Sequence, residues 1–302
     1  MESAAACGVS IDKIYIPKRI RDYLQLHDSL RFMMKSQIFG QSFFVNQNSY
    51  FEALIFDRIK FNPAMSRIFF THKSDVGISS YDYSKYLNLC EKIFTYNSND
   101  KKLLISMGIN SDRVETVYGA VNRKIFYPMK EISEINLVYK HPYVLIAGDC
   151  KERKNPNLML EIILQMPTYN FIIHGRGWKK FIVGKLKRVP KNLDILNFKF
   201  ENQAKLIREA SSYLSLSKLE GGPYPTLEAL ASGTPVLVTD TGWNSEIVNA
   251  RSGFVVPTYF SVADVINKLK ICIEMKKETW NTDLLDSKYT WGELGRKIFY
   301  LD

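Results

Sequence analysis

Short apolar runs alternate with longer stretches of helical periodicity through the second half of the chain. The runs that read as strands are YVLIAG (143–148), NFIIHG (170–175), LDILNF (193–198), YLSLS (213–217) and PVLVT (235–239). Helical stretches such as NPNLMLEIILQM and ENQAKLIREAS separate them, and a last helical region begins at about residue 262. Strands that are apolar throughout and are separated by helices are typical of a parallel sheet buried on both faces. This alternation predicts an α/β domain.

The first half of the chain is less regular but uses similar elements. Its strand candidates are SFFVNQ (42–47), RIFFTH (67–72), KIFTYN (92–97) and VETVYG (114–119). They predict a second, smaller α/β unit. The segment 122–141 contains a proline and mixed charges, so we expect the linker there.

The composition of the chain indicates which partners the protein can have and in which cellular compartment we expect it. The chain has 41 Lys and Arg against 31 Asp and Glu, a formal charge of +10, which favours an anionic partner or is simply a soluble basic surface. The four cysteines stand singly, without the short spacing of a zinc site or redox pair, which indicates a reducing, cytoplasmic location: Cys7, Cys90, Cys150 and Cys272. No apolar run reaches the roughly 20 residues of a membrane span, so we expect any membrane contact to be peripheral.

Three loops that follow predicted strands carry cations, glycines or a helix start. DCKERKNP brings Arg153 and Lys154, RGWKK follows Gly175, and KLEGGPYP precedes a helix that we expect from about Pro225. Ligands of open parallel sheets bind beyond the carboxyl ends of the strands, where all three loops emerge. Each feature alone is typical of a solvated loop or a simple turn, but together they favour a diphosphate site.

Two glutamates stand on either side of the Gly-Gly-Pro-Tyr-Pro turn. We expect Glu228 in the first turn of the following helix, where the helix dipole stabilises a carboxylate and a purely structural role suffices. Glu220 precedes the turn, where a buried carboxylate needs hydrogen-bond donors, and sugar hydroxyls are suitable donors.

Several segments resemble one enzyme family. The segment EGGPYPTLEALASGTPVLVTDTGWNSEIV is similar to the signature of the family 4 retaining glycosyltransferases. YNSNDKKLLISMGINSDRVETVYGAVNRKIFYP, AGDCKERKNPNLMLEII and SKYTWGELGRKIFY resemble further parts of the same pattern, which the chain follows from about residue 67 to its end.

The resemblance implies an α/β fold of the GT-B class, with two Rossmann-like domains whose parallel sheets face each other across a cleft. We expect a reduced acceptor-side domain at 1–130, a nucleotide-sugar-binding domain at 131–287, and a terminal helix at 288–302 that packs back on the first domain. The function implied is a hexosyltransferase that moves a sugar from a UDP-, GDP- or ADP-sugar to a glycan, lipid-linked or other hydroxyl acceptor. Anomeric retention without a metal or cofactor is implied as well.

The same resemblance assigns roles to individual residues. Glu228 would hold the donor's ribose, Glu220 the hydroxyls of the transferred sugar, and Arg153 with Lys154 the diphosphate. His72 matches a histidine near the reacting sugar, although a lone histidine at a strand end is more often structural. The residues expected to act in catalysis are Glu220, His72, Lys154 and Arg153. The residues expected to bind the donor are Gly175, Gly222, Pro223, Tyr224, Pro225, Thr226 and Glu228.

Two departures from the family pattern keep a second function open. The first half lacks a Gly-rich loop, and Asp149 stands where many members have an arginine. The alternative is therefore a non-catalytic nucleotide-sugar-binding or scaffold subunit that needs a partner chain or an oligomer for activity. A hydride-transferring enzyme is disfavoured because Gly175-Arg176-Gly177 is followed by Lys180 instead of a third glycine.

The remaining partners concern the membrane and nucleic acid. The segment 18–40 has an apolar side flanked by basic residues, which is typical of an ordinary core-facing helix or of peripheral membrane contact. Since only the net charge would favour nucleic acid, we expect none as a partner.

Overall fold

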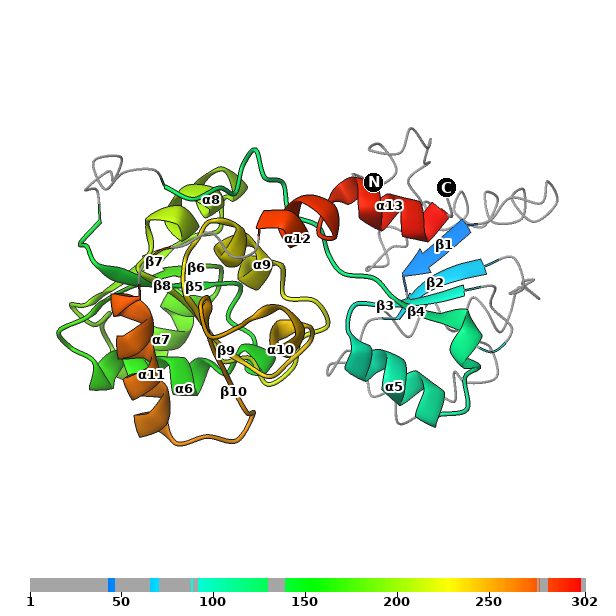
Figure 1. Ribbon diagram of the computed structural model, residues 1–302. Helices are drawn as coiled ribbons and strands as arrows, with labels where there is room; N and C mark the ends of the chain where they lie inside the picture. The colour runs from blue at the N-terminus through cyan, green and yellow to red at the C-terminus, as the bar shows by residue number, and fades with distance from the viewer. Residues whose placement is uncertain are drawn as a thin grey trace, which may run out of the picture. The chain divides into compact units, whose positions relative to one another are not determined.

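The computed structural model describes residues 43–46, 66–70, 88, 92–129, 139–275, 277 and 282–299. The chain divides into two compact units, which are Met1–Tyr118 with Trp291–Asp302, and Gly119–Thr290 (Figure 1). The segment 18–40, for which we expected a basic amphipathic helix, lies outside the described residues. No helix within the described ranges is long and apolar enough to cross a membrane.

The first unit contains a four-stranded sheet in the order β1-β2-β3-β4. All of its pairings are parallel, and the strands are β1 (Phe43–Asn46), β2 (Ser66–Phe70), β3 (Lys92–Thr95) and β4 (Val114–Thr116). Helix α5 (Ser98–Ser106) connects β3 to β4 through the short η4 (Ser111–Arg113). Asn97 caps α5, because its side chain accepts a hydrogen bond from the N–H of Asp100. This unit also contains α13 (Trp291–Phe299).

The second unit contains a six-stranded, all-parallel sheet in the order β10-β9-β8-β5-β6-β7. Its strands are β5 (Tyr143–Ala147), β6 (Asn170–His174), β7 (Leu193–Leu196), β8 (Ser212–Ser215), β9 (Val236–Thr239) and β10 (Gly253–Val256). The α/β fold with two parallel sheets is thereby confirmed. Only β10 had no counterpart among the predicted strands, because GFVV is short and begins with glycine.

The strand order reverses between β5 and β8. From β5 the chain builds outward through β6 to β7, then returns to the other side of β5 and builds outward through β8 and β9 to β10. In open parallel sheets, a crevice forms beyond the carboxyl ends of the two strands at such a reversal. The loops after β5 and β8 therefore occupy the favoured place for a ligand.

Helices cover both faces of this sheet (Figure 1). Helices α6 (Pro156–Gln165), α7 (Trp178–Leu186) and α11 (Val262–Glu274) share one core with side chains of the strands, such as Ile146 and Leu214. The opposite face carries α8 (Phe200–Glu209), to which the Tyr143 hydroxyl donates at Leu206 O (2.9 Å), and α9 (Tyr224–Ala231).

Smaller elements complete the second unit. These are η6 (Glu152–Lys154), α10 (Asn244–Ile247) and α12 (Thr282–Ser287). Helix α7 has no counterpart among the helical stretches named from the sequence, because lysines and Gly184 obscure its apolar side, which buries Trp178 and Ile182.

Candidate functional site

The loops after β5 and β8 are joined to each other at the reversal of strand order. The two strands are paired neighbours in the sheet. Beyond their ends, the N–H of Lys218 donates to Arg153 O at 2.7 Å. The short helix η6 therefore presents Arg153 and Lys154 directly beside the segment that leads to Glu220.

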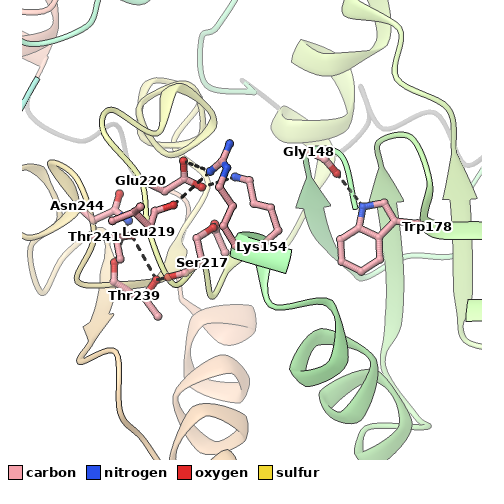
Figure 2. Close-up of polar contacts among 11 residues, drawn as sticks. Gly148, Lys154, Trp178, Ser217, Leu219, Glu220, Thr239, Thr241 and Asn244 are labelled. Atoms are coloured by element: carbon pink, nitrogen blue, oxygen red, sulfur yellow. Dashed lines mark hydrogen bonds and ion pairs between the residues drawn. The ribbon is translucent and has the colours of Figure 1, made fainter. Parts of the chain in front are cut away.

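A buried carboxylate lies between these two cations (Figure 2). Arg153 Nη1 is 2.7 Å from Glu220 Oε2, and Lys154 Nζ is 2.5 Å from Glu220 Oε1. The same Nη1 donates to Leu219 O at 3.2 Å. Only 9% of the Glu220 side chain is exposed, so each of its oxygens has a cation in place of water.

The two cations decide the charge of Glu220. Burial by itself raises the pKa of this carboxyl, but Lys154 and then Arg153 outweigh burial, and the pKa lies below its ordinary value. Glu220 is therefore ionised at neutral pH. Its place at the exit of β8 agrees with the expectation that a carboxylate there needs hydrogen-bond donors.

Two glycines allow the ends of β5 and β6 to approach each other. A Cβ added to Gly175 would lie 2.0 Å from Gly148 O, which is backbone and cannot move aside. Gly148 has φ of +122°, and its carbonyl accepts a hydrogen bond from Trp178 Nε1 at 2.8 Å (Figure 2). Lys154 Cε would be 3.3 Å from a Cβ at Gly148. The glycine therefore leaves room for the lysine side chain, and Gly175 fixes the spacing of the two loops.

The turn after Glu220 offers fewer backbone donors than its sequence suggests. Pro223 and Pro225 have no N–H, while the N–H groups of Tyr224 and Thr226 donate to Gly222 O and Pro223 O at 3.0 Å each. Of the N–H groups of residues 222–226, this leaves the N–H of Gly222 for an oxygen of the predicted diphosphate.

Side chains add to this turn. A Cβ added to Gly222 would meet the Trp243 ring at 2.5 Å, so only glycine fits beneath the indole. The Thr226 Oγ1 is buried and has no hydrogen-bond partner among the described residues. A buried hydroxyl without a partner at the start of a helix can donate to a ligand oxygen.

Glu228 lies deeper in α9 than expected. The helix begins at Tyr224, so the prediction that Glu228 stands in its first turn is wrong, and the helix dipole does not account for this carboxylate. Burial raises the pKa of Glu228 to about 7, against a hydrogen bond from Gln203 Nε2 (3.1 Å) that lowers it.

Both glutamates lie close enough to Tyr213, on β8, for their charges to act on it. Burial raises the pKa of the Tyr213 phenol, and the charges of Glu220 and Glu228 both raise it further. Tyr213 is fully buried. The two carboxylates therefore belong to one region around β8.

A third cation reaches this edge of the sheet from the loop after β6. Arg176 Nη2 donates to Asp149 Oδ2 at 2.7 Å, and Arg176 Nε lies 3.2 and 3.1 Å from Oδ1 and Oδ2. The Arg176 side chain is 74% exposed. Asp149, which departs from the family pattern, thus holds an arginine from the neighbouring loop. No pattern in the sequence marks this pair, apart from an arginine between two glycines.

The structure brings most of the predicted residues into one region. Arg153, Lys154 and Glu220 are in direct contact, and Gly175 adjoins them through Gly148. The remaining predicted donor-binding residues lie in the turn after Glu220 and in α9, namely Gly222, Pro223, Tyr224, Pro225, Thr226 and Glu228. His72 lies outside the described residues. Among the residues that are described, no group of three or more His, Cys, Asp or Glu could hold a metal ion.

The sequence is similar to those of known glycosyltransferases. The family model described as glycosyl transferases group 1 matches residues 129–282. The O-antigen biosynthesis glycosyltransferase WbnH of Escherichia coli is 26% identical over 188 residues, which cover 61% of this chain and 52% of that protein. The chain thus spans about half the length of the curated relatives that it matches.

Solved structures resemble the fold. A glycosyltransferase from Rickettsia africae matches with a TM-score of 0.70 at 14% identity, over 97% of this chain and 83% of that one. HepE from Anabaena, in complex with UDP and glucose, matches with a TM-score of 0.68 at 14% identity, over 97% and 85% of the two chains. These glycosyltransferases have the GT-B fold, so the fold class expected from the sequence is confirmed.

We expect Lys154→Met to destabilise the chain by about 2 kcal/mol at about pH 7, because it leaves the buried Glu220 carboxylate with one cation fewer. In the unaltered chain the pKa of Glu220 is lowered, so its contribution to stability is present above the ordinary pKa of 4.5 and is lost as the pH falls. The difference between the two chains should therefore shrink at about pH 4. Urea unfolding at both pH values measures it, with Lys270→Met, an exposed lysine on α11, as the control. A pH-independent difference would contradict this account.

Glu228→Gln should show the opposite pH dependence. The carboxyl has a raised pKa in the folded chain, so folding binds a proton and the unaltered chain loses stability as the pH rises from 4.5 to about 7. The amide keeps an acceptor for Gln203 but never becomes charged. We expect the variant to gain on the order of 1 to 3 kcal/mol relative to the unaltered chain between about pH 5 and about pH 8. Unfolding free energies at both pH values measure this gain, and a constant difference would refute it.

Proposed function

Because the chain belongs to the glycosyl transferases group 1 family, we propose that it is an enzyme that transfers a sugar from a nucleoside diphosphate sugar to a hydroxyl acceptor. The observation that carries this proposal is the pair of cations, Arg153 and Lys154, that Glu220 holds at the reversal of strand order. That reversal is where sheets of this kind bind nucleotides.

Arg153 and Lys154 retain N–H groups that can donate to a diphosphate. A guanidinium carries five N–H donors and an ammonium three, and the contacts to Glu220 and Leu219 use only some of them. We assign the rest to the oxygens of the leaving diphosphate, where negative charge accumulates as the bond to the sugar breaks. Fixed cations at that position stabilise the transition state without rearranging. The HepE complex with UDP and glucose supports a nucleotide donor.

We further propose that the anomeric configuration is retained. The acceptor hydroxyl forms a bond to the anomeric carbon on the face from which the diphosphate departs, and its proton passes to a diphosphate oxygen. Charge neutralisation is assigned to Arg153 and Lys154 rather than to a metal ion. Glu220 has no part as a nucleophile in this scheme; it holds both cations in place and accepts hydrogen bonds from the hydroxyls of the transferred sugar.

The acceptor that we propose is a glycan, and in particular a lipid-linked glycan. The Escherichia coli relatives WbnH and WbiN are named for O-antigen biosynthesis, which is glycan assembly. A lipid-linked acceptor would bring the protein to the cytoplasmic face of a membrane as a peripheral protein. The excess of 41 basic over 31 acidic residues favours such an anionic surface.

Nucleotide binding tests the proposal first. We expect one of UDP, GDP and ADP to raise the melting temperature of the unaltered chain. Lys154→Met and Arg153→Met should each weaken its binding about tenfold or more, because each removes a charged donor to the diphosphate. Lys270→Met, which alters an exposed lysine on α11, should bind like the unaltered chain.

Release of the nucleoside diphosphate from the matching sugar nucleotide, with glycan acceptors present, tests the activity itself. No thermal shift with any of the three diphosphates, together with no turnover, would overturn the proposal. Binding without turnover until another protein is added would instead favour a non-catalytic subunit.

A further inference from the structure

A buried chain of hydrogen bonds leads from the loop after β7 to the carboxylate of Glu228. The backbone N–H of Lys199 donates to His174 Nε2 at 3.0 Å, and His174 Nδ1 lies 2.6 Å from Gln203 Oε1. Gln203 Nε2 then donates to Glu228 Oε2 at 3.1 Å. These hydrogen bonds connect the end of β6 with α8 and α9, three elements that are separate in the sequence.

The backbone N–H of Lys199 determines which atom donates and which accepts in each of these hydrogen bonds. A backbone N–H can only donate, so His174 Nε2 must accept, and the proton of the neutral imidazole is on Nδ1. His174 therefore donates to Gln203 Oε1, which turns the Gln203 amide NH₂ toward Glu228. Burial lowers the pKa of His174, which agrees with a neutral ring at this place.

The members of the chain are too well buried to exchange these bonds for water. His174 is fully buried and Gln203 is 3% exposed. The ring of Phe198 packs against the His174 ring, with 5.0 Å between centroids. If Gln203 could not donate, Glu228 Oε2 would face a buried side chain without a hydrogen bond, and the carboxylate would turn or take up a proton.

We propose that Gln203 and His174 are positioning residues that aim the Glu228 carboxylate at the ribose hydroxyls of the donor. The inference rests on the proposed function, because it takes the ribose as the ligand of Glu228. In this arrangement, His174 fixes the amide of Gln203, and Gln203 occupies Oε2 of the carboxylate. The other oxygen, Oε1, then accepts from the ribose. Neither positioning residue touches the donor.

The test compares a ribonucleotide with its counterpart that lacks the ribose hydroxyls. The probes are the best-bound of UDP, GDP and ADP and the 2′,3′-dideoxy form of the same diphosphate, with dissociation constants measured by calorimetry. Gln203→Met keeps the length of the side chain without its amide. We expect it to weaken ribonucleotide binding about tenfold, the loss of one hydrogen bond that involves a charged group. Binding of the dideoxy form should be unchanged, because that ligand offers Glu228 no hydroxyl.

Two variants of His174 separate positioning from general damage. His174→Asn places a side-chain NH₂ near the former Nδ1, so it still donates to Gln203 Oε1, and it should retain the preference for the ribonucleotide. His174→Leu has no donor and should lose that preference. Thermal melting of each variant checks that it folds.

The outcomes distinguish this inference from the proposed function. If Gln203→Met weakens both probes equally, or weakens neither, the inference is overturned while the proposed function stands. If the unaltered chain binds no nucleoside diphosphate, both are overturned. A readout without any ligand is the ¹⁵N spectrum of His174, which should show a neutral ring with the proton on Nδ1. A proton on Nε2 would overturn the inference whatever the binding results.

Discussion

The ion pairs of Glu220 with Arg153 and Lys154 are the interactions on which the candidate site depends. Two loops, from strands far apart in the sequence, carry three charges into a place where little water reaches the carboxylate. Removing either cation would leave the buried carboxylate with one cation fewer, and removing the carboxylate would leave both cations without their common partner. The backbone bond from Lys218 to Arg153 joins the same loops. The ion pairs and this backbone hydrogen bond therefore hold the two loops in the same arrangement.

The strand order explains why such loops meet at all. Since β5 and β8 are neighbours although two strand–helix units separate them in sequence, the reversal brings together residues that no local pattern relates. The charges of both glutamates act on Tyr213 of β8, and Gln203 of α8 donates a hydrogen bond to Glu228. One edge of the sheet thus carries two carboxylates in different states: Glu220 with a lowered pKa between cations, and Glu228 with a pKa of about 7.

The features that were predicted correctly from the sequence are those that depend on local patterns of residues. Strands such as 143–147 and 170–174 were found because their apolar runs are continuous, and Arg153, Lys154 and Glu220 because they stand in the loops that follow strands. The start of α9 was predicted to within one residue, at about Pro225 against Tyr224, but Glu228 then lies beyond the first turn. The Asp149–Arg176 pair and the bonds of His174 with Gln203 join loops and helices through space. No spacing in the sequence marks such contacts.

The charge balance of this edge bears on how a donor would bind. In the two ion-paired groups, Arg153, Lys154 and Arg176 contact the carboxylates of Glu220 and Asp149, so these five side chains carry one net positive charge. A nucleoside diphosphate or its sugar carries two or three negative charges. One net positive charge cannot neutralise that diphosphate. Under the proposed function, the diphosphate must therefore share cations that already contact Glu220 and Asp149. Arginine is suited to this, because its planar fork can serve a carboxylate and a phosphate through different N–H groups at once. Asp149 stands where many members of the family have an arginine, and it holds Arg176 of the neighbouring loop, whose side chain remains 74% exposed at the same edge of the sheet.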